Sequence, residues 1–396
     1  MFLLDCPVMP YAWGSRSAIA SLRGHEVPAA EPQAELWMGA HPLAPSKLAQ
    51  AHGGRSLVHL IEEAPEHHLG ERVLSRFGTR LPFLMKVLAA EEPLSLQAHP
   101  SLDRAKAGFE REERAGIPLS ASHRVYKDPN HKPELLCALE PFEALSGFRE
   151  HPEALEVLTA LGVPHLEPIL TLLRSSSTPL KDTFEALMRL ADEHRAPLVE
   201  AVGAAARERA KDGGPHARAY HWAATLAHRY PGDAGVVSSL LLRHVELAVG
   251  EAIFLPAGNL HAYLRGVGIE IMASSDNVLR GGLTTKHVDV EELLAVLDFD
   301  AVGPELVKPE VVRAGVHAYR TSAPDFELSR IEVTDGAIVA EVESAEIVFC
   351  AKGEVVLSGA TSVTLRSGES AFVPASVAAY RAEGSGTLFR ATPGRS

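Results

Sequence analysis

Cysteine is scarce in this sequence, and its few thiols stand far apart. Cys6, Cys137 and Cys350 are the only three among 396 residues, and no two of them form a CxxC spacing. An odd number of isolated cysteines predicts neither a disulfide framework nor a thiolate zinc site. The sequence therefore favours a reducing compartment, and we expect the protein in the cytoplasm.

Long hydrophobic runs and an excess of positive charge are also missing. No stretch approaches the roughly 18 consecutive apolar residues that span a bilayer, and the N-terminal MFLLDCPVMPYAWGS has no basic region of the kind that precedes an export signal. The formal net charge is -13, whereas a nucleic-acid surface needs clustered Lys and Arg. We therefore expect neither a membrane nor a nucleic acid as partner.

The chain is long enough for several domains. Residues 1–149 hold short apolar runs broken by Pro and Gly, which favours strands. In residues 150–233 apolar side chains recur at helical spacing, which predicts a helical insert. Residues 234–310 return to strand-like runs and are expected to complete the first β-domain. Residues 311–396 alternate apolar and polar residues between Gly turns, as a small β-barrel does.

One turn pattern occurs twice. The two copies are Gly250-x5-Pro256-x-Gly258-x2-His261 and Gly368-x5-Pro374-x-Ser376-x2-Ala379. The first resembles a motif of the cupin superfamily, in which a double-sheet jelly roll holds a metal ion inside the barrel. The resemblance implies a mainly β fold with two cupin-type jelly-roll β-barrel domains plus an α-helical domain. Because the second copy lacks the His, only the first barrel is expected to bind metal.

Several polar residues could hold a divalent metal ion. Residues i and i+2 of a strand face the same way, so Gln97 and His99 can share one ion. Glu134 follows a Pro in an extended stretch and would supply the carboxylate that Gln and His lack. His261 stands in the cupin-like turn. These residue types suit zinc, although Gln97, His99 and Glu134 taken singly more often have an ordinary hydrogen-bonded or ion-paired role, and His261 has one as often as not.

Six ordered segments together are similar to the type I phosphomannose isomerase family. They are YAWGS (11–15), AELWMGAHP (34–42), LPFLMKVLAAEEPLSLQAHP (81–100), YKDPNHKPELL (126–136), FLPAGNLHAYL (254–264) and SSDNVLRGGLTTK (274–286). The resemblance implies a zinc-dependent aldose-ketose isomerase. It would interconvert D-mannose 6-phosphate and D-fructose 6-phosphate by enediol proton transfer between C1 and C2. A small sugar phosphate would be its partner, and a monomer is expected.

The resemblance also implies a role for individual residues. One Zn2+ per chain would be held by Gln97, His99, Glu134 and His261. The residues implied on the substrate side are Ser95 and Lys86 near the phosphate, and Tyr263 and Glu270 in the pocket. Those implied in catalysis are Arg280 beside the enediolate, Lys132 as proton shuttle, and His131 with Asp276 in ring opening. Asp276 is also expected to orient Arg280.

Some questions remain open at this point. Lys132, Glu270 and zinc-bound water are all candidates for the proton-transfer group, and Trp37 and His41 receive no catalytic role. Two other functions fit the ligand set. One is an iron-dependent cupin oxygenase, since His and carboxylate ligands also hold iron. The other is a sugar-phosphate sensor that keeps the metal pocket without the chemistry.

Overall fold

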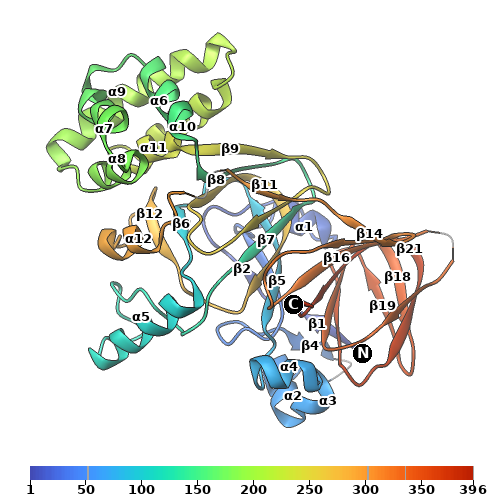
Figure 1. Cartoon of the computed structure of the whole chain (residues 1–396). Coiled ribbons are helices and arrows are strands. Elements are labelled where there is room, and N and C mark those ends of the chain that lie inside the picture. Colours follow the sequence, from blue (N-terminus) through green and yellow to red (C-terminus); the bar gives the residue numbers. More distant parts are fainter. Residues whose placement is uncertain (51–52, 301–302, 335, 396) are drawn as a thin grey trace.

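The computed structural model describes residues 1–396 except 51–52, 301–302, 335 and 396. Two β-structures lie side by side, and a group of helices covers one end of the first (Figure 1). The predicted mainly β fold with a helical part is therefore confirmed. Among the described helices, none is both long and apolar enough to cross a membrane.

The first sheet is assembled from segments on both sides of the helical group. Its strands are β2 (Val8–Met9), β3 (Glu35–Met38), β5 (Phe83–Ala90), β6 (Leu96–Ala98), β7 (Glu134–Ala138), β8 (Phe142–Phe148), β9 (Leu242–Leu247), β10 (Ala252–Leu255), β11 (His261–Ala273), β12 (Leu279–Gly282) and β13 (Glu305–Val307). The main path runs β13-β10-β7-β11-β5-β3-β2, and β6, β8, β9 and β12 connect to it through β11. The antiparallel pairing of β11 with β5 and β7 joins the two halves of the domain.

Strand alternation places charged side chains inside the first barrel. In β5, Phe83, Met85 and Val87 belong to the apolar core that is shared with the second sheet. Because successive side chains of a strand point to opposite faces, Lys86 points to the barrel interior. Neighbouring strands follow the same rule. The charged side chains that reach this interior are Glu35 on β3, Lys86 on β5, Glu134 on β7 and Glu270 on β11.

Strand β11 passes through both layers of the barrel and supplies residues to each. His261 pairs with Gln97 of β6 in one layer, and Glu270 pairs with Lys86 of β5 in the other. A β-bulge and Gly266 lie between these two positions. Gly266 has φ +133°, and a Cβ atom there would lie 2.6 Å from the Phe142 ring. Only glycine therefore allows the strand to bend against Phe142.

The second sheet is formed mainly by the C-terminal part of the chain. Its strands are β1 (Phe2–Asp5), β4 (Lys47–Leu48), β14 (Glu310–Arg313), β15 (Val316–Tyr319), β16 (Glu327–Val333), β17 (Ile338–Glu341), β18 (Glu346–Ser358), β19 (Ser362–Arg366), β20 (Ser370–Val373) and β21 (Ala379–Thr392). They pair in the order β14-β15-β16-β21-β18-β20-β1-β4, with β17 on β21 and β19 on β18. The N-terminal strand β1 thus lies in the C-terminal sheet, although residues 1–149 were assigned to the first domain.

The repeated turn pattern is a structural repeat as well. Gly250 and Gly368 have φ 86° and 83°, and each lies two residues before a short strand, β10 or β20. The strand after the turn then begins at His261 in the first copy and at Ala379 in the second. The same backbone route therefore carries an imidazole in one barrel and a methyl group in the other.

Helices also interrupt residues 1–149, where the sequence analysis expected mostly strands. They are α1 (Ala18–Leu22), α2 (Leu57–Glu63), α3 (Pro65–Leu69), α4 (Glu71–Phe77) and α5 (Leu102–Arg114). Ser56 and Ser101 cap α2 and α5, because their hydroxyls accept hydrogen bonds from Val58 N and Arg104 N. A serine at such a position is the sequence signal for a helix start.

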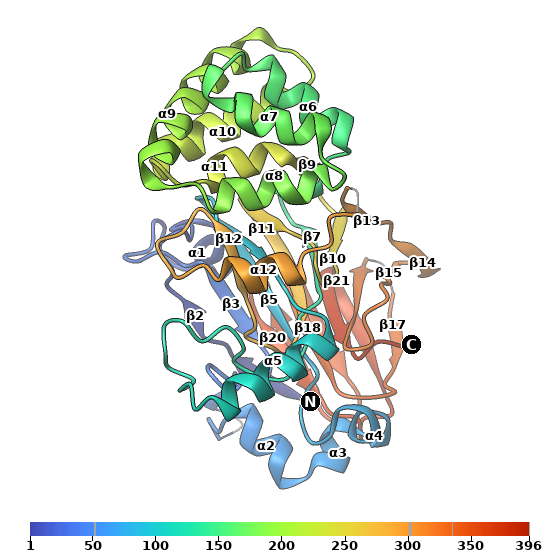
Figure 2. The ribbon, with the colours of Figure 1, turned by 60° about the vertical axis from the view of Figure 1, so that its left-hand side comes forward.

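The helical group follows β8 and rests on one end of the first barrel (Figure 2). Its helices are α6 (His151–Ala160), α7 (Glu167–Ser175), α8 (Pro179–Met188), α9 (Asp192–Arg209), α10 (Ala217–Arg229) and α11 (Gly235–Ser238), and α12 (Val290–Val296) follows β12. A polar contact fixes α10 to the barrel. Glu143 of β8 accepts hydrogen bonds from Arg218 Nε at 2.9 Å, Trp222 Nε1 at 2.7 Å and His244 Nε2 at 2.8 Å.

An aromatic contact joins the helical group to the barrel through one apolar core. Phe148 at the end of β8 is fully buried, and its ring lies edge-on to Phe184 of α8 with the centroids 5.9 Å apart. It also stacks on Phe299 at 4.8 Å. The helices are therefore held on the barrel by a continuous hydrophobic core as well as by Glu143.

We expect Phe148→Ala to lower the free energy of unfolding by about 3 to 5 kcal/mol, because it leaves a cavity between β8 and α8. Urea unfolding followed by circular dichroism measures this change. Val249→Ala is the matched control: Val249 is 61% exposed, so its truncation should cost less than about 0.5 kcal/mol. An equal loss in both variants would show that Phe148 does not join the two parts.

Candidate metal centre and adjoining cavity

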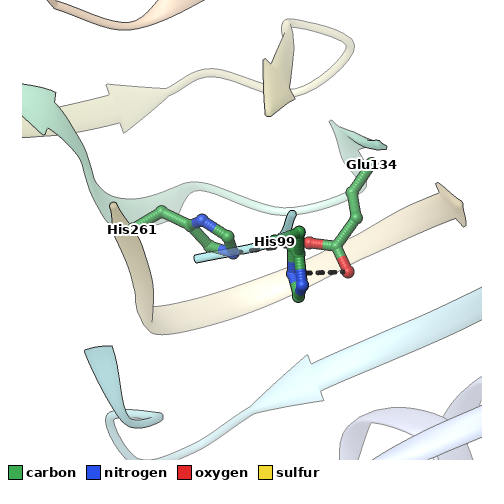
Figure 3. A group of neighbouring side chains, drawn as sticks. All are labelled: His99, Glu134 and His261. Atoms are coloured by element: carbon green, nitrogen blue, oxygen red, sulfur yellow. Dashed lines mark ion pairs between the residues drawn. The ribbon is translucent and has the colours of Figure 1, made fainter. Parts of the chain in front are cut away.

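Three of the predicted metal ligands meet in the interior of the first barrel. His99 follows β6, Glu134 begins β7 and His261 begins β11. Figure 3 shows both imidazoles next to the Glu134 carboxylate, with dashed lines marking the two ion pairs. His99 Nε2 lies 3.4 Å from Glu134 Oε1, and His261 Nε2 lies 3.4 Å from Glu134 Oε2. All three side chains are almost completely buried.

The hydrogen bonds of the two histidines leave their Nε2 atoms free to act as ligands. Nδ1 of His99 lies 2.7 Å from the carbonyl oxygen of Asn277, and Nδ1 of His261 lies 3.1 Å from that of Asn259. A carbonyl can only accept, so Nδ1 carries the proton and Nε2 presents its lone pair. Within the described structure His99 Nε2, His261 Nε2 and Glu134 Oε2 have no hydrogen-bond partner. Two nitrogens and a carboxylate oxygen without partners suit a divalent metal ion.

The charge state of the cluster agrees with metal binding. Burial lowers the pKa of His99 to about 4, so the imidazole is neutral near pH 7. Burial acts to raise the pKa of Glu134, but Lys132 and the two histidines outweigh it and bring that pKa well below the ordinary value. Nζ of Lys132 lies 3.1 Å from Glu134 Oε1. The site therefore combines the neutral imidazole of His99 with an ionised carboxylate.

Gln97 lies next to this cluster on β6. Its backbone pairs with His261 on one side and with Arg280 of β12 on the other. The side chain of Gln97 lines a cavity of about 590 Å³ that adjoins the cluster. An amide oxygen at this position is available to a metal ion or to a molecule in the cavity.

The cavity is lined by most of the residues that the sequence analysis selected. They are Lys86, Ser95, Gln97, Lys132, Glu134, Tyr263, Glu270, Asp276 and Arg280. His99 and His261 contact Glu134 but are not themselves among the residues that line the cavity. The structure thus brings the predicted substrate-side residues and the metal cluster to one place.

A buried ion-pair network forms one wall of the cavity. Lys86 Nζ lies 2.9 Å from Glu270 Oε2 and 3.4 Å from Glu35 Oε1. Burial alone would lower the pKa of Lys86, but the two carboxylates outweigh burial and raise it, so Lys86 remains a cation. The Tyr263 hydroxyl donates to Glu270 Oε1 at 3.0 Å, and Trp37 Nε1 donates to Glu35 Oε2 at 2.7 Å. Both oxygens of Glu270 are therefore engaged.

Arg280 and Lys286 bring positive charge to another part of the cavity. Arg280 donates to Ser95 Oγ at 2.8 Å, and it forms no ion pair with a carboxylate of the described residues. Burial lowers the pKa of Arg280. The positive charge of Arg280, followed by burial, lowers the pKa of Lys286. Two neighbouring cations without a carboxylate favour the binding of an anion.

Two expectations from the sequence differ from the structure. His131 points away from the cavity, since its Nε2 lies 2.7 Å from Asp325 Oδ2 just before β16. Asp276 does not pair with Arg280. Its Oδ1 lies 3.5 Å from Nε2 of His41 instead. A residue far away in the sequence determines each of these side-chain directions, so the local motifs could not reveal them.

The sequence analysis also missed several residues of the cavity. Glu35 received no role, although a charged residue in the apolar strand ELWM is a signal that could have been used. Tyr11 and Trp13 line the cavity from the YAWGS segment. Arg229 and Tyr230 reach it from the end of α10, where no motif distinguishes them. The helical group thus forms part of the cavity wall.

Comparisons with known proteins support this geometry. Residues 1–151 match the catalytic domain of type I phosphomannose isomerase, and residues 317–393 match the cupin domain of mannose-6-phosphate isomerase, which confirms the cupin-type fold. The chain is 40% identical over 386 residues to mannose-6-phosphate isomerase of Escherichia coli (strain K12), covering 97% of each chain. It is 32% identical over 399 residues to mannose-6-phosphate isomerase 1 of Arabidopsis thaliana, covering 94% of this chain and 89% of that one.

Solved structures show the same similarity. A crystal structure of zinc-bound mannose 6-phosphate isomerase superposes with a TM-score of 0.91 at 38% identity, over 99% of both chains. A variant of phosphomannose isomerase from Salmonella typhimurium gives a TM-score of 0.92 at 38% identity, over 100% of this chain and 99% of that one.

We expect the chain to retain one zinc ion after dialysis and His261→Ala to lose it, because the substitution removes one nitrogen of the buried cluster. Elemental analysis by mass spectrometry measures the stoichiometry. His244→Ala is the matched control. Glu143, His244 and Glu246 form a second group with metal-ligand spacing, but Glu143 is already engaged by Arg218, Trp222 and His244. Retention of zinc by His261→Ala and its loss from His244→Ala would place the ion at the second group.

Proposed function

Since the chain belongs to the type I phosphomannose isomerase family, we propose that it interconverts D-mannose 6-phosphate and D-fructose 6-phosphate with zinc as its metal ion. The observation that carries the proposal is the buried His99-Glu134-His261 cluster beside a cavity with unpaired cations. A carbonyl-polarising metal and a cationic wall are what an anionic sugar undergoing an enediol reaction requires.

Zinc would be held by His99, Glu134 and His261, with the amide oxygen of Gln97 as the fourth ligand. The free Nε2 atoms and the partnerless Glu134 Oε2 support this set, and so does the preference of zinc for nitrogen and oxygen ligands in a four-coordinate arrangement. A bound zinc ion supplies Lewis-acid stabilisation to an oxygen that gains negative charge. One carboxylate among neutral ligands leaves the site a net positive charge for this purpose.

Arg280 and Ser95 bind one part of the substrate together, because they are hydrogen-bonded to each other. The guanidinium of Arg280 is available to an anion, either the phosphate or the negative charge of the enediolate. Lys86 is less available, since Glu270 and Glu35 already neutralise its charge. We therefore propose that Lys86 holds Glu270 in place and that Arg280, with Lys286 nearby, supplies positive charge to the substrate.

Lys132 is the proposed proton shuttle. As the free amine it would take the proton from C2 of the opened mannose 6-phosphate and give the same proton to C1, while the hydroxyl proton of O2 passes to O1, so that the amine ends the turnover unchanged. Its Nζ lies 3.1 Å from Glu134 and therefore beside a sugar bound at the metal centre. Glu270 is the less suitable base because Lys86 and Tyr263 occupy both of its oxygens. His131 is left out of the machinery because it faces Asp325.

Neither alternative function finds support. The relatives that cover nearly the whole chain are named isomerases rather than oxygenases or sensors. Every proposed ligand and cavity residue comes from one chain, so a monomer is sufficient for the site. The three cysteines are buried and unpaired, which supports the proposal that the enzyme works in the cytoplasm.

We expect chelator-stripped protein to be inactive and added zinc to restore turnover, because the ion would supply the Lewis-acid stabilisation that the enediolate oxygen requires. A coupled assay of fructose 6-phosphate formation from mannose 6-phosphate measures this. Circular dichroism before and after stripping controls for unfolding. No turnover by folded protein with zinc bound would contradict the proposed function.

We expect Arg280→Ala to lower kcat/KM by about 100-fold to 1000-fold, as for the loss of a donor that stabilises developing negative charge. Arg280→Lys should recover part of the loss, since it keeps the charge without the planar guanidinium. Arg265→Ala serves as control, because Arg265 lies on β11 with a side chain that is 65% exposed. Wild-type kinetics in Arg280→Ala would show that Arg280 does not act on the substrate.

A further inference from the structure

The turn after β3 places a buried histidine against Trp37 and Asp276, two residues that line the cavity. His41 is only 3% exposed, and its Nε2 lies 3.5 Å from Oδ1 of Asp276. Its ring lies edge-on to Trp37, with the centroids 5.0 Å apart. The turn itself is closed by Ser46, whose Oγ accepts from Gly39 N at 3.0 Å and whose N donates to Gly39 O at 2.9 Å. His41 therefore has a fixed position.

The hydrogen bonds of His41 also determine where its proton lies. The backbone N–H of Leu43 points to Nδ1 at 3.4 Å. An N–H group can only donate, so Nδ1 carries the lone pair and Nε2 carries the hydrogen. Nε2 is also the ring nitrogen that lies 3.5 Å from Oδ1 of Asp276.

Asp276 differs from the other carboxylates of the cavity. The lining carboxylates are Glu35, Glu134, Glu270 and Asp276. Lys86 neutralises Glu35 and Glu270, and Glu134 belongs to the metal cluster and pairs with Lys132. Among the described residues Asp276 forms no ion pair with a lysine or arginine, and 36% of its side chain is exposed. It is therefore the carboxylate that is free to accept a proton from a bound sugar.

The backbone of Asp276 is held as firmly as its side chain. Its N–H donates to Asp128 Oδ2 at 2.8 Å, and the same oxygen accepts from the hydroxyl of Ser275 at 3.1 Å. Because the backbone is fixed, the freedom that remains to Asp276 is the rotation of its carboxylate. His41 is placed to restrict that rotation. Such orientation of a reacting group by a neighbour contributes strongly to catalysis.

We propose that His41 is a positioning residue that holds Asp276 for the opening of the sugar ring, an inference that rests on the proposed function. The carboxylate takes the proton of the anomeric hydroxyl as the C1–O1 bond becomes a carbonyl. The C1–O5 bond breaks and its electron pair goes to O5. Asp276 then gives the same proton to O5, and the carboxylate is regenerated. Ring opening thus uses Asp276 with His41, whereas proton transfer between C2 and C1 uses Lys132.

The test is the enzyme-catalysed exchange between the two anomers of 2-deoxy-D-glucose 6-phosphate. This sugar has no hydroxyl on C2, so it can open and close its ring but cannot become a ketose. Magnetisation-exchange NMR with the zinc-loaded enzyme measures the exchange rate. Isomerisation of mannose 6-phosphate is measured in parallel.

We expect Asp276→Asn to lose about 100-fold in anomer exchange, the loss typical of a general base. His41→Phe should lose about tenfold or more, as for a residue that orients a catalytic group. His41→Gln should keep most of the rate, because its amide N–H still reaches Asp276, whereas the shorter His41→Asn should lose it. Lys132→Gln should lose isomerisation but retain anomer exchange. His165→Phe, at an exposed position of the helical group, is the control.

The other possible results of these measurements also test the role of His41. Wild-type exchange rates in both His41→Phe and His41→Asn would overturn the role of His41. The contrast between His41→Gln and His41→Asn still applies if His41→Phe fails to fold. A wild-type enzyme that isomerises mannose 6-phosphate without accelerating anomer exchange would overturn this inference and leave the proposed function intact. Absence of both activities would instead refute the proposed function.

Discussion

The interior of the first barrel depends on a lysine that is buried between two carboxylates. An unpaired charge in such a place would cost several kcal/mol, so Glu35, Lys86 and Glu270 stabilise one another. Three neighbouring strands, β3, β5 and β11, must be in register for the contact to form. Tyr263 donates to Glu270 and Trp37 donates to Glu35, so these groups together form one polar wall of the cavity.

The two β-domains show how one backbone plan can serve different purposes. Both use a left-handed glycine, a short strand and a turn before a long strand, but only the first places His261 at the start of that strand. The interior of the second barrel is filled by apolar side chains such as Val348, Val355 and Leu365. That barrel supports the first through their shared hydrophobic contacts.

The sequence reveals the family and the fold class because the relevant signals are local. Strand alternation and the spacing of Gln97 from His99 or Lys132 from Glu134 report which side chains share a face, and the structure brings these side chains together. Side chains whose direction depends on distant segments escape such reasoning. His131 turns to Asp325, Asp276 turns to His41, and Tyr230 reaches the cavity from a helix with no recognisable motif. These contacts arise only when the β-domains and the helical group pack together.

The pairing of β1 with β20 has a consequence for how the protein is made. Phe2 lies opposite Phe372 of β20, so most of the chain separates the two strands in sequence. Strand β4 pairs with β1 only at Leu4 and Asp5, whereas β20 pairs with it from Phe2 to Leu4. Contacts of such long sequence separation form slowly, and the second barrel can close only after β20 has been synthesised. A nascent chain that stalls before β20 would leave this part of β1 unpaired for chaperones or proteases to recognise.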